Sequence, residues 1–409
     1  MPGILDGLRI VEHAAFVAAP LGGMTLAQLG AEVIRCDPIG GGLDYRRWPV
    51  TRDGKGLYWA GLNKGKKSLA VDTRHPRGRE LLTALITAPG PESGLFVTNF
   101  PARGWLAYDT LKQRRADLIM VNVVGNPDGS AALDYTVNSA VGFPYATGPV
   151  GHDGPINHVL PAWDVATGVT AAVGLLAAER HRGRTGQGQY IKLALADVAF
   201  AMAGNLGHIA EAQINGDVRA RYGNDLYGAL GRDFVTRDGK RIMLVALTLK
   251  QWQGLLEATG AGAAVAEIER RAGRDFTREG DRFEGRTDLF ALFGPWIAAR
   301  EFAEVAASFD KHGVCWGPYR DFGEMVRDDP RCSTANPMFT AVEQPGIGRY
   351  LMPGSPLDFS AVGRVPPAPA PLLGEHTDEV LGRVLGLSGR EIGDLHDSGI
   401  VAGPDKAEG

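Results

Sequence analysis

The chain has 409 residues, of which 44% are hydrophobic and 22% are charged, and its formal net charge is -4. This ordinary globular composition argues against wholesale disorder and, at about 150 residues per domain, predicts two or three domains. The acidic balance gives no support to a nucleic-acid partner or to a polybasic membrane anchor.

Strand and helix patterns alternate along the first half of the chain. We expect strands at 8–14, 31–36, 68–72, 95–98 and 118–124 and helices at 20–29 and 76–85. Elements at this spacing predict βαβ units with right-handed crossovers and a parallel sheet. A buried helix at 164–180, a strand at 189–195 and a helix at 197–213 are predicted next. The pattern indicates a doubly wound α/β domain.

A second, smaller domain is predicted downstream. Residues 215–224, 234–247 and 249–311 are typical of a polar linker, a hairpin and amphipathic helices. Beyond Pro330, proline- and glycine-rich segments predict an extended return crossing. Residues 376–395 predict a last helical stretch.

Several common site motifs are absent. There is no HExxH, GxSxG or GxGxxG, and segment 61–68 lacks the spacing of a P-loop. Histidines do not pair at metal-ligand spacing and Cys36, Cys315 and Cys332 form no CxxC, so we expect no metal and reduced thiols in the cytoplasm. The longest nearly apolar stretch, 165–178, is too short to span a bilayer, and no signal peptide is indicated.

Basic residues cluster in the N-terminal part of the chain. They form either a solvated rim or a site that holds the phosphates of a polyanionic small molecule at strand ends. The cluster consists of Arg46, Arg47, Lys64, Lys66, Lys67, Arg74, Arg77 and Arg103. His376 could be a catalytic base, but a lone histidine near a helix start is more often structural.

Asp164 stands at the start of the apolar helix pattern. From the residues alone, the favoured interpretation is a helix N-cap, whose side-chain oxygen accepts a backbone N–H. A catalytic role is compatible with that interpretation. The helix dipole favours an ionised carboxylate, and an ionised carboxylate in a partly dry cleft can attack a thioester.

Several motifs, in the right order, resemble the class III CoA-transferases, the family that includes formyl-CoA and carnitine-CoA transferases and α-methylacyl-CoA racemases. The resemblance covers nearly the whole chain, through segments 5–35, 63–72, 98–100, 163–197, 313–330 and 372–387. Six segments most resemble family members that move CoA between the two carboxyl groups of one unsaturated C5 dicarboxylic acid: 16–35, 37–51, 95–106, 115–125, 336–359 and 374–381.

The resemblance implies a fold and a substrate. The implied fold has a Rossmann-like large domain built from both chain ends, a smaller α+β domain, and a homodimer whose protomers interlink like chain rings. Residues 1–214 and 331–409 would form the large domain, and residues 215–330 the linker and small domain. The substrate would be an acyl-CoA thioester of the C5 diacid, so CoA arrives as part of the substrate and no other cofactor is expected.

The family's nucleophilic aspartate matches Asp164, which implies an aspartyl anhydride and an aspartyl-CoA thioester as intermediates. CoA-contacting positions of the family carry over to Val17, Ala18, Val71, Asp72, Thr73, Arg74, Asn99, Phe100, Arg103, Tyr135 and Asn138.

Three features depart from the family pattern. Pro38 stands where relatives often place a basic residue near the adenine, and the loop that carries Arg103 is shortened. The glycine-rich loop that covers the site in the formyl-CoA enzymes has no clear match, and Gly223, Gly228 and Gly231 are candidates for a different cover.

Three alternative functions remain open. An intermolecular CoA transferase would use two separate acids. A racemase would need an acid/base pair to remove an α-proton, but residues 133–138, where racemases of the family carry a histidine, contain none. A CoA-binding or scaffold protein would catalyse no reaction.

Overall fold

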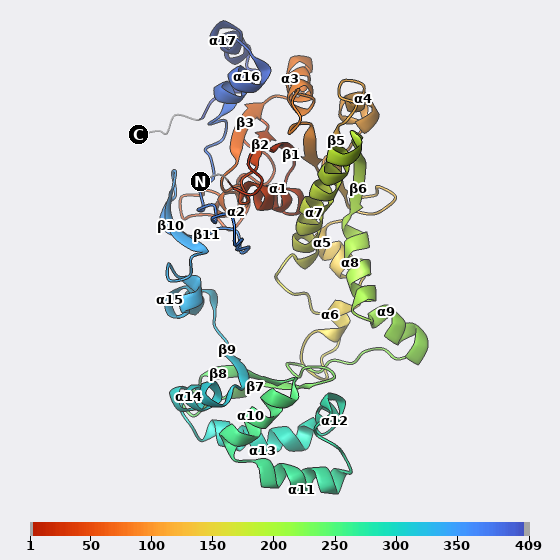
Figure 1. The fold of residues 1–409 in the computed structure, drawn as a ribbon, viewed down its shortest axis with the longest axis vertical. Helices are drawn as coiled ribbons and strands as arrows, with labels where there is room; N and C mark the ends of the chain where they lie inside the picture. Colours follow the sequence, from red (N-terminus) through yellow and green to blue (C-terminus); the bar gives the residue numbers. More distant parts are fainter. Residues whose placement is uncertain (1–2, 405–409) are drawn as a thin grey trace. The chain divides into compact units, whose positions relative to one another are not determined.

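The computed structural model describes residues 3–404, which divide into two compact units (Figure 1). The first unit contains the chain up to Val141, residues 158–211, and the chain from Pro330 onward. The second unit contains residues 142–157 and 212–329. The first unit is therefore built from segments that lie far apart in the sequence.

Residues 142–157 group with the second unit, although the division predicted from the sequence places them in the large domain. The side chain of Arg221 provides a physical reason. Its guanidinium donates hydrogen bonds to the backbone carbonyls of Pro144, at 3.2 Å, and of His152 and Gly154. These contacts attach residues 142–157 to a part of the chain that follows them by about 70 positions.

A seven-stranded sheet forms the centre of the first unit, in the order β12-β3-β2-β1-β4-β5-β6. Neighbouring strands are parallel except β12, which pairs antiparallel with β3. The strands are β1 (Arg9–His13), β2 (Glu32–Asp37), β3 (Lys67–Val71), β4 (Leu95–Thr98), β5 (Ile119–Val124), β6 (Tyr190–Ala194) and β12 (Val401–Ala402). This mixed α/β fold with a large parallel sheet confirms the predicted fold class. The order reverses between β1 and β4, where doubly wound sheets bind ligands outside the carboxyl ends of the strands.

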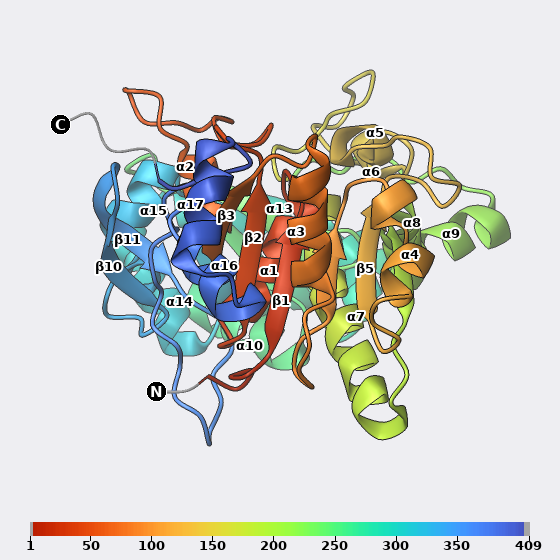
Figure 2. The ribbon, with the colours of Figure 1, turned by 90° about the horizontal axis from the view of Figure 1, so that it is seen from above.

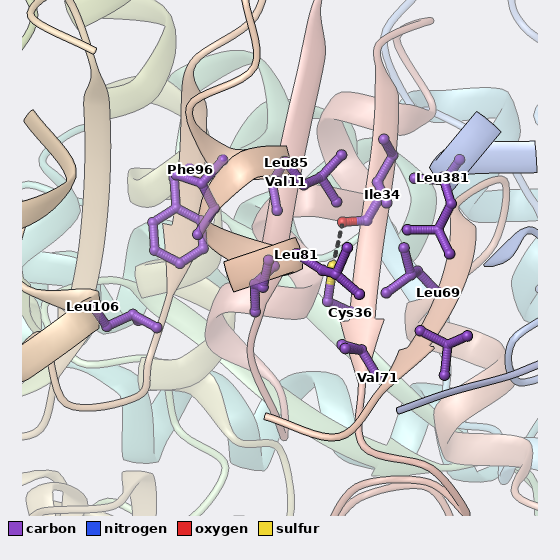
Figure 3. Close-up of a cluster of buried hydrophobic side chains, with 14 of the residues drawn as sticks. Val11, Ile34, Cys36, Leu69, Val71, Leu81, Leu85, Phe96, Leu106 and Leu381 are labelled. Atoms are coloured by element: carbon purple, nitrogen blue, oxygen red, sulfur yellow. Dashed lines mark hydrogen bonds between the residues drawn. The ribbon is translucent and has the colours of Figure 1, made fainter. Parts of the chain in front are cut away.

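The sheet is buried on both faces, because neighbouring residues of each strand point to opposite sides. Val11 packs in one core with α3 (Pro76–Ile86), α16 (Thr377–Leu385) and α17 (Gly389–Asp397). Figure 3 shows this core, in which side chains from β1, β2 and β3 meet Leu81, Leu85 and Leu381. Ile10, one residue earlier, packs on the other face with α1 (Ala18–Ala27) and α7 (Ala162–Thr185). The strands β3, β2 and β1 lie side by side in Figure 2.

Helices α1 and α7 approach closely because each carries a glycine at the contact. A Cβ on Gly168 would lie 2.6 Å from the backbone oxygen of Ala18, and a Cβ on Gly22 would lie 2.9 Å from the backbone oxygen of Gly168. Neither position can therefore accept a side chain without movement of a backbone. This packing holds the first turn of α7 beside the loop that joins β1 to α1.

Several predicted elements of the first unit are divided in the structure. The extended return crossing contains an antiparallel hairpin, β10 (Phe339–Gln344) and β11 (Gly348–Pro353), because Gly346 adopts φ +71° in the turn. The last predicted helical stretch is two helices. The first ends at Gly386, which adopts the left-handed conformation at φ +69°, and the second begins after its N-cap residue Ser388. The helix predicted at 197–213 also ends early, since Gly207 adopts φ +85°. The pieces are α8 (Leu195–Asn205), α9 (His208–Ala210) and η2 (Glu211–Asn215).

Short helices complete the first unit and the return segment. They are α2 (Leu57–Leu62), η1 (Gly104–Leu106), α4 (Tyr108–Lys112), α5 (Asp134–Asn138) and η3 (Pro330–Cys332). Of these, α5 contacts α7 and carries two side chains of the candidate site.

The second unit has its own core around a three-stranded antiparallel sheet, β7 (Leu230–Val235), β8 (Arg241–Ala246) and β9 (Cys315–Pro318). The predicted hairpin is present, and Gly239 takes φ +78° in its turn. The helices are α6 (Phe143–Ala146), α10 (Leu249–Thr259), α11 (Gly262–Ala272), α12 (Glu279–Glu284), α13 (Arg286–Ala298), α14 (Phe302–His312) and α15 (Phe322–Asp328). Across residues 3–404, no helix combines the length and apolar character needed to cross a membrane.

Candidate active site

Asp164 is the third residue of α7, and its helix is capped by another aspartate. The Oδ2 atom of Asp134 accepts hydrogen bonds from the backbone N–H groups of Trp163, at 2.8 Å, and Asp164, at 2.9 Å. The prediction that Asp164 is itself the N-cap is wrong, because Pro161 occupies that position and the capping carboxylate comes from α5. The carboxylate of Asp164 is left without a hydrogen bond to any residue between 3 and 404.

The surroundings of Asp164 oppose its ionisation. Burial raises the pKa of its carboxyl to about 7, the negative charge of Asp134 adds to the rise, and the positive charge of Arg47 reduces it. The predicted effect of the helix dipole, a fully ionised carboxylate, is therefore outweighed by burial and by the second carboxylate. Asp134 is buried, and its Oδ1 atom has no hydrogen-bond partner within the described range.

Arg47 provides the positive charge of this cluster. Its guanidinium lies over the rings of Phe16 and Tyr58, with centroid distances of 5.5 and 5.6 Å. We call Asp164, Asp134 and Arg47 the Asp164 cluster. All three belong to the first unit.

The loop between β1 and α1 is held by two side chains from other parts of the sheet. The side-chain amide of Asn99 donates to the carbonyl of Ala15, at 2.8 Å, and its oxygen accepts the N–H of Ala15, at 2.9 Å. The Oδ2 atom of Asp44 accepts the N–H of Phe16, at 2.9 Å. Phe16 has φ +68°, a conformation that a non-glycine residue adopts only when its surroundings hold it there. The loop therefore has one defined shape.

Asp44 in turn belongs to a group of paired charges that we call the buried ionic network. Arg35 donates to Asp37, Asp44, Glu12 and Asn63 at 2.9–3.4 Å. Lys66 donates to both carboxylate oxygens of Glu12, at 2.8 and 2.9 Å. The network consists of Glu12, Arg35, Asp37, Asp44, Asn63 and Lys66.

The structure separates the predicted basic cluster into different roles. Lys66 is fully buried against Glu12, and burial lowers its pKa to about 8, so neither interpretation of the cluster, a solvated rim or a phosphate site, fits Lys66. Lys67 pairs with Glu32, at 3.0 Å, and Arg74 pairs with Asp72, at 2.9 Å. Lys64 is buried, and its ammonium donates to a backbone carbonyl. The other members are exposed: Arg46, Arg47, Arg77 and Arg103.

The predicted CoA contacts fall into three groups. Val17, Ala18, Asn99 and Phe100 lie together where β1 and β4 end, and the Phe100 ring lies 4.6 Å from that of His13. A second group, Val71, Asp72, Thr73 and Arg74, follows the end of β3. Tyr135 and Asn138 lie on α5.

Several of these side chains cannot face a ligand as they stand. Val17, Ala18 and Val71 are buried, so only their backbones could contact CoA. Asn138 is also buried, and its oxygen accepts the indole N–H of Trp163, at 3.1 Å, so it positions α7. Tyr135 is 46% exposed. Arg103 is exposed and precedes η1, and among residues 3–404 its side chain forms no ion pair.

Other candidates from the sequence can also be located. His376 accepts the N–H of Ser68 on its Nδ1 atom, at 3.3 Å, as a structural histidine would. Gly223, Gly228 and Gly231 lie in the second unit. Among residues 3–404, no group of three or more histidine, cysteine or acidic side chains is placed to hold a metal ion.

Sequence reasoning missed Asp134, Tyr58 and Asp44. Asp134 and Asp44 act on residues 28 to 30 positions away, so no local pattern marks them. One signal was present for Arg47: it stands in a glycine-rich segment among other basic residues, although the sequence does not distinguish it from them.

Comparison with known proteins matches this arrangement to one family. The sequence profile of CoA-transferase family III matches residues 5–377. The chain is 64% identical over 408 residues to 2-methylfumaryl-CoA isomerase of Chloroflexus aurantiacus, with 100% of both chains covered. It is 29% identical over 399 residues to succinyl-CoA:mesaconate CoA-transferase of Haloarcula hispanica, with 93% of this chain and 96% of the relative covered.

A solved structure has the same fold. The crystal structure of a CAIB/BAIF family protein from Brucella suis superimposes with a TM-score of 0.75 at 25% identity. The superposition covers 94% of this chain and 100% of that one. The mixed α/β architecture is thus shared over nearly the whole length.

Proposed function

The chain belongs to CoA-transferase family III, and from this premise we propose that it is an intramolecular CoA transferase that converts 2-methylfumaryl-CoA into 3-methylfumaryl-CoA. The observation that carries the proposal is the 64% identity, over the full length of both chains, to an enzyme named for the isomerisation of that thioester. In this reaction CoA moves from the C1 to the C4 carboxyl group of mesaconate. CoA is part of the substrate, and the proposal needs no other cofactor.

The proposed route begins with two transfers on Asp164. Its ionised carboxylate attacks the C1 thioester carbonyl, which forms a mixed anhydride and releases CoA as the thiolate. The thiolate then attacks the Asp164 carbonyl carbon, which forms an aspartyl-CoA thioester and frees mesaconate with two carboxylates. Covalent catalysis of this kind divides one difficult exchange into easier steps.

The return steps use the other end of the diacid. The C4 carboxylate attacks the aspartyl-CoA thioester, which forms the second anhydride and again releases the thiolate. Attack of the thiolate on the C4 carbonyl gives the product and restores the Asp164 carboxylate. No net proton is consumed. Because anhydrides and thioesters hydrolyse, the protein has to exclude water, and it has to keep the free diacid in the site.

The surroundings of Asp164 support this use. The side chain is half-buried and accepts no hydrogen bond within residues 3–404, while Asp134 fixes the backbone of the same helical turn. The first N–H groups of α1, at Ala18 and after it, have no acceptor inside their own helix and could stabilise oxyanions. A pKa of about 7 keeps a useful fraction of Asp164 ionised near neutrality.

The position of CoA follows from the sheet. We place it along the carboxyl ends of β1, β3 and β4, because ligands of doubly wound sheets bind where the strand order reverses. The contacts proposed are those inferred from the family resemblance: Val17, Ala18, Val71, Asp72, Thr73, Arg74, Asn99, Phe100, Arg103, Tyr135 and Asn138.

The interlinked homodimer also remains part of the proposal. Large apolar side chains on α7 and α8 are exposed, among them Val173 at 61% and Phe200 at 46%. Exposed apolar surface of this kind is typical of a protein interface. The cytoplasm, inferred from cysteine usage, is the proposed location.

Replacement of Asp164 tests the proposal. We expect Asp164→Ala to abolish formation of 3-methylfumaryl-CoA, measured by liquid chromatography, and to leave CoA binding nearly intact. Wild-type enzyme quenched with hydroxylamine during turnover should carry a modified carboxyl at Asp164, detected by mass spectrometry. Asp197 is the matched control, since it is also the third residue of a helix but is exposed on α8.

The results separate the proposal from its rivals. A rate near that of wild type in Asp164→Ala would remove this residue from the mechanism. Heavy incorporation of labelled free mesaconate into the product of the wild type would favour transfer between two separate acids. Solvent deuterium at an α-carbon would favour a racemase.

A further inference from the structure

Intramolecular transfer, as proposed above, needs a group that keeps the diacid in place while CoA is bound to the enzyme. At that stage mesaconate carries two negative charges and has no covalent bond to the protein. A cation beside the nucleophile, with no other partner, would supply the missing attraction. The inference that follows rests on the proposed function.

Most cations on and around β1 to β3 are already neutralised. Arg35 and Lys66 are committed to the carboxylates of the buried ionic network. Lys67 and Arg74 pair with Glu32 and Asp72. These groups would have to break an ion pair before they could bind a substrate carboxylate.

Arg47 differs from all of them. Within residues 3–404, it forms no ion pair with a carboxylate, although Asp44 lies only three residues earlier. Asp44 accepts from Arg35 and from the N–H of Phe16 instead. The ring of Phe16, over which its guanidinium lies, precedes Ala18 by two residues, and the backbone oxygen of Ala18 lies against Gly168, one turn along α7 from Asp164. This geometry places Arg47 in the neighbourhood of the nucleophile, and its positive charge accordingly lowers the pKa of Asp164.

Aromatic side chains hold Arg47 in this position. The guanidinium lies over the rings of both Phe16 and Tyr58, and the backbone of Phe16 is itself held by Asp44. Cation–π contacts and a planar fork of donors limit the loss of side-chain freedom when a carboxylate binds. An arginine supported in this way fits bidentate recognition of a carboxylate.

We propose that Arg47 binds the carboxylate of the diacid that is not bonded to CoA and retains free mesaconate while CoA is on Asp164. In the trans diacid the two carboxyl groups point in opposite directions, so one can face Asp164 while the other faces Arg47. Reorientation of the diacid exchanges the two ends. Arg47 thereby selects a dicarboxylic acyl group and keeps the transfer intramolecular.

The test compares Arg47→Gln with wild-type enzyme on two substrates. One is 2-methylfumaryl-CoA, and the other is 2-methylbut-2-enoyl-CoA, which has a methyl group in place of the free carboxylate. We expect the variant to isomerise the first substrate on the order of 100-fold more slowly, as for loss of one partner of a bound charge pair. Transfer of CoA from the second substrate to Asp164, measured by mass spectrometry after a quench, should change by less than about fivefold, because Arg47 would touch no carboxylate there.

A second readout follows the fate of the diacid. With isotopically labelled free mesaconate present, the label found in the product per isomerisation should be low in wild type and should rise at least about tenfold in Arg47→Gln. Arg47→Lys keeps the positive charge but lacks the planar guanidinium and its paired donors. Its incorporation of label per isomerisation should lie between those of the wild type and Arg47→Gln. Assays at pH 9 keep Asp164 ionised in every variant, so a changed charge on the nucleophile does not account for the result.

Arg52→Gln is the matched control, since Arg52 is exposed and lies five residues from Arg47 in the same segment. It should behave as wild type. The inference is overturned if Arg47→Gln loses activity equally on both substrates, or if it isomerises normally without added exchange. Failure of the wild type itself to isomerise, or free exchange of label by the wild type, would instead overturn the proposed function.

Discussion

The buried ionic network and the Asp164 cluster lie in the same unit, yet their charges are arranged in opposite ways. In the network, both oxygens of Glu12 accept from Lys66, and Arg35 distributes its donors over three carboxylates. In the Asp164 cluster, the negative charge of Asp134 raises the pKa of Asp164, one oxygen of Asp134 is unsatisfied, and Arg47 has no carboxylate partner within the described residues. Paired charges fix a structure, whereas unpaired charges leave capacity for a substrate.

The buried network should therefore contribute stability, and Lys66→Met tests this most directly. The substitution leaves the carboxylate of Glu12 buried without its main partner, which typically costs about 3–5 kcal/mol. We expect a decrease of this size in the free energy of unfolding, measured by urea denaturation. The pKa of Lys66 is lowered to about 8 by burial, so the effect should be measured near pH 7, where the ammonium is present.

Lys67→Met is the matched control for that experiment. Lys67 is the next residue, but it is partly exposed and pairs with Glu32 near the surface. Exposed pairs contribute about 0–1 kcal/mol. Equal losses in the two variants would mean that the network is no more important to stability than a surface ion pair.

The charge of Asp164 should instead lower the free energy of unfolding. Its pKa is raised to about 7 in the folded protein from 3.8, so the protonated form is favoured by folding. This contribution to stability is present below the unfolded pKa and is lost as the pH rises to about 7. Asp164→Asn keeps the shape without the charge, so above pH 7 we expect the variant to be more stable than wild type by about 1–3 kcal/mol.

The pH dependence provides the internal control for that prediction. At pH 4 the side chain of Asp164 is neutral in the folded wild type, and the advantage of Asp164→Asn should nearly vanish. Urea denaturation of both proteins at pH 4 and pH 8 measures the difference. An unchanged difference between the two pH values would show that ionisation of Asp164 carries no cost in the folded state.

Features that depend on neighbouring residues could be predicted from the sequence, whereas the charge contacts of the two clusters could not. The parallel sheet was predictable because the local hydrophobic periodicity of the sequence indicates each βαβ unit, as in β1, α1 and β2. Asp164 was identified through a family resemblance, but its local interpretation as an N-cap failed because Asp134, 30 residues earlier, supplies the cap. Lys66 was grouped with the basic cluster, as a rim residue or a phosphate contact, because its partner Glu12 is 54 residues away. Contacts of this range depend on how the sheet assembles, which local patterns do not encode.

The smallest expected effect concerns the tuning of Asp164 by Asp134. The nucleophile must be ionised, so the rate of isomerisation should fall about tenfold per pH unit below pH 7 in wild type. Asp134→Asn removes the second negative charge, while an amide oxygen can still accept the N–H groups of Trp163 and Asp164. We expect the acid limb of the pH–rate profile to move by about one unit toward lower pH.

The direction of that movement separates two roles of Asp134. If Asp134 acted only as a helix cap, its replacement would lower the rate at every pH and leave the midpoint of the profile unchanged. If its charge helps to hold Asp164 near neutrality, the midpoint moves down, and activity below pH 6 rises relative to wild type. Because burial remains the larger cause of the raised pKa, the midpoint should stay above the ordinary value of 3.8 even in the variant.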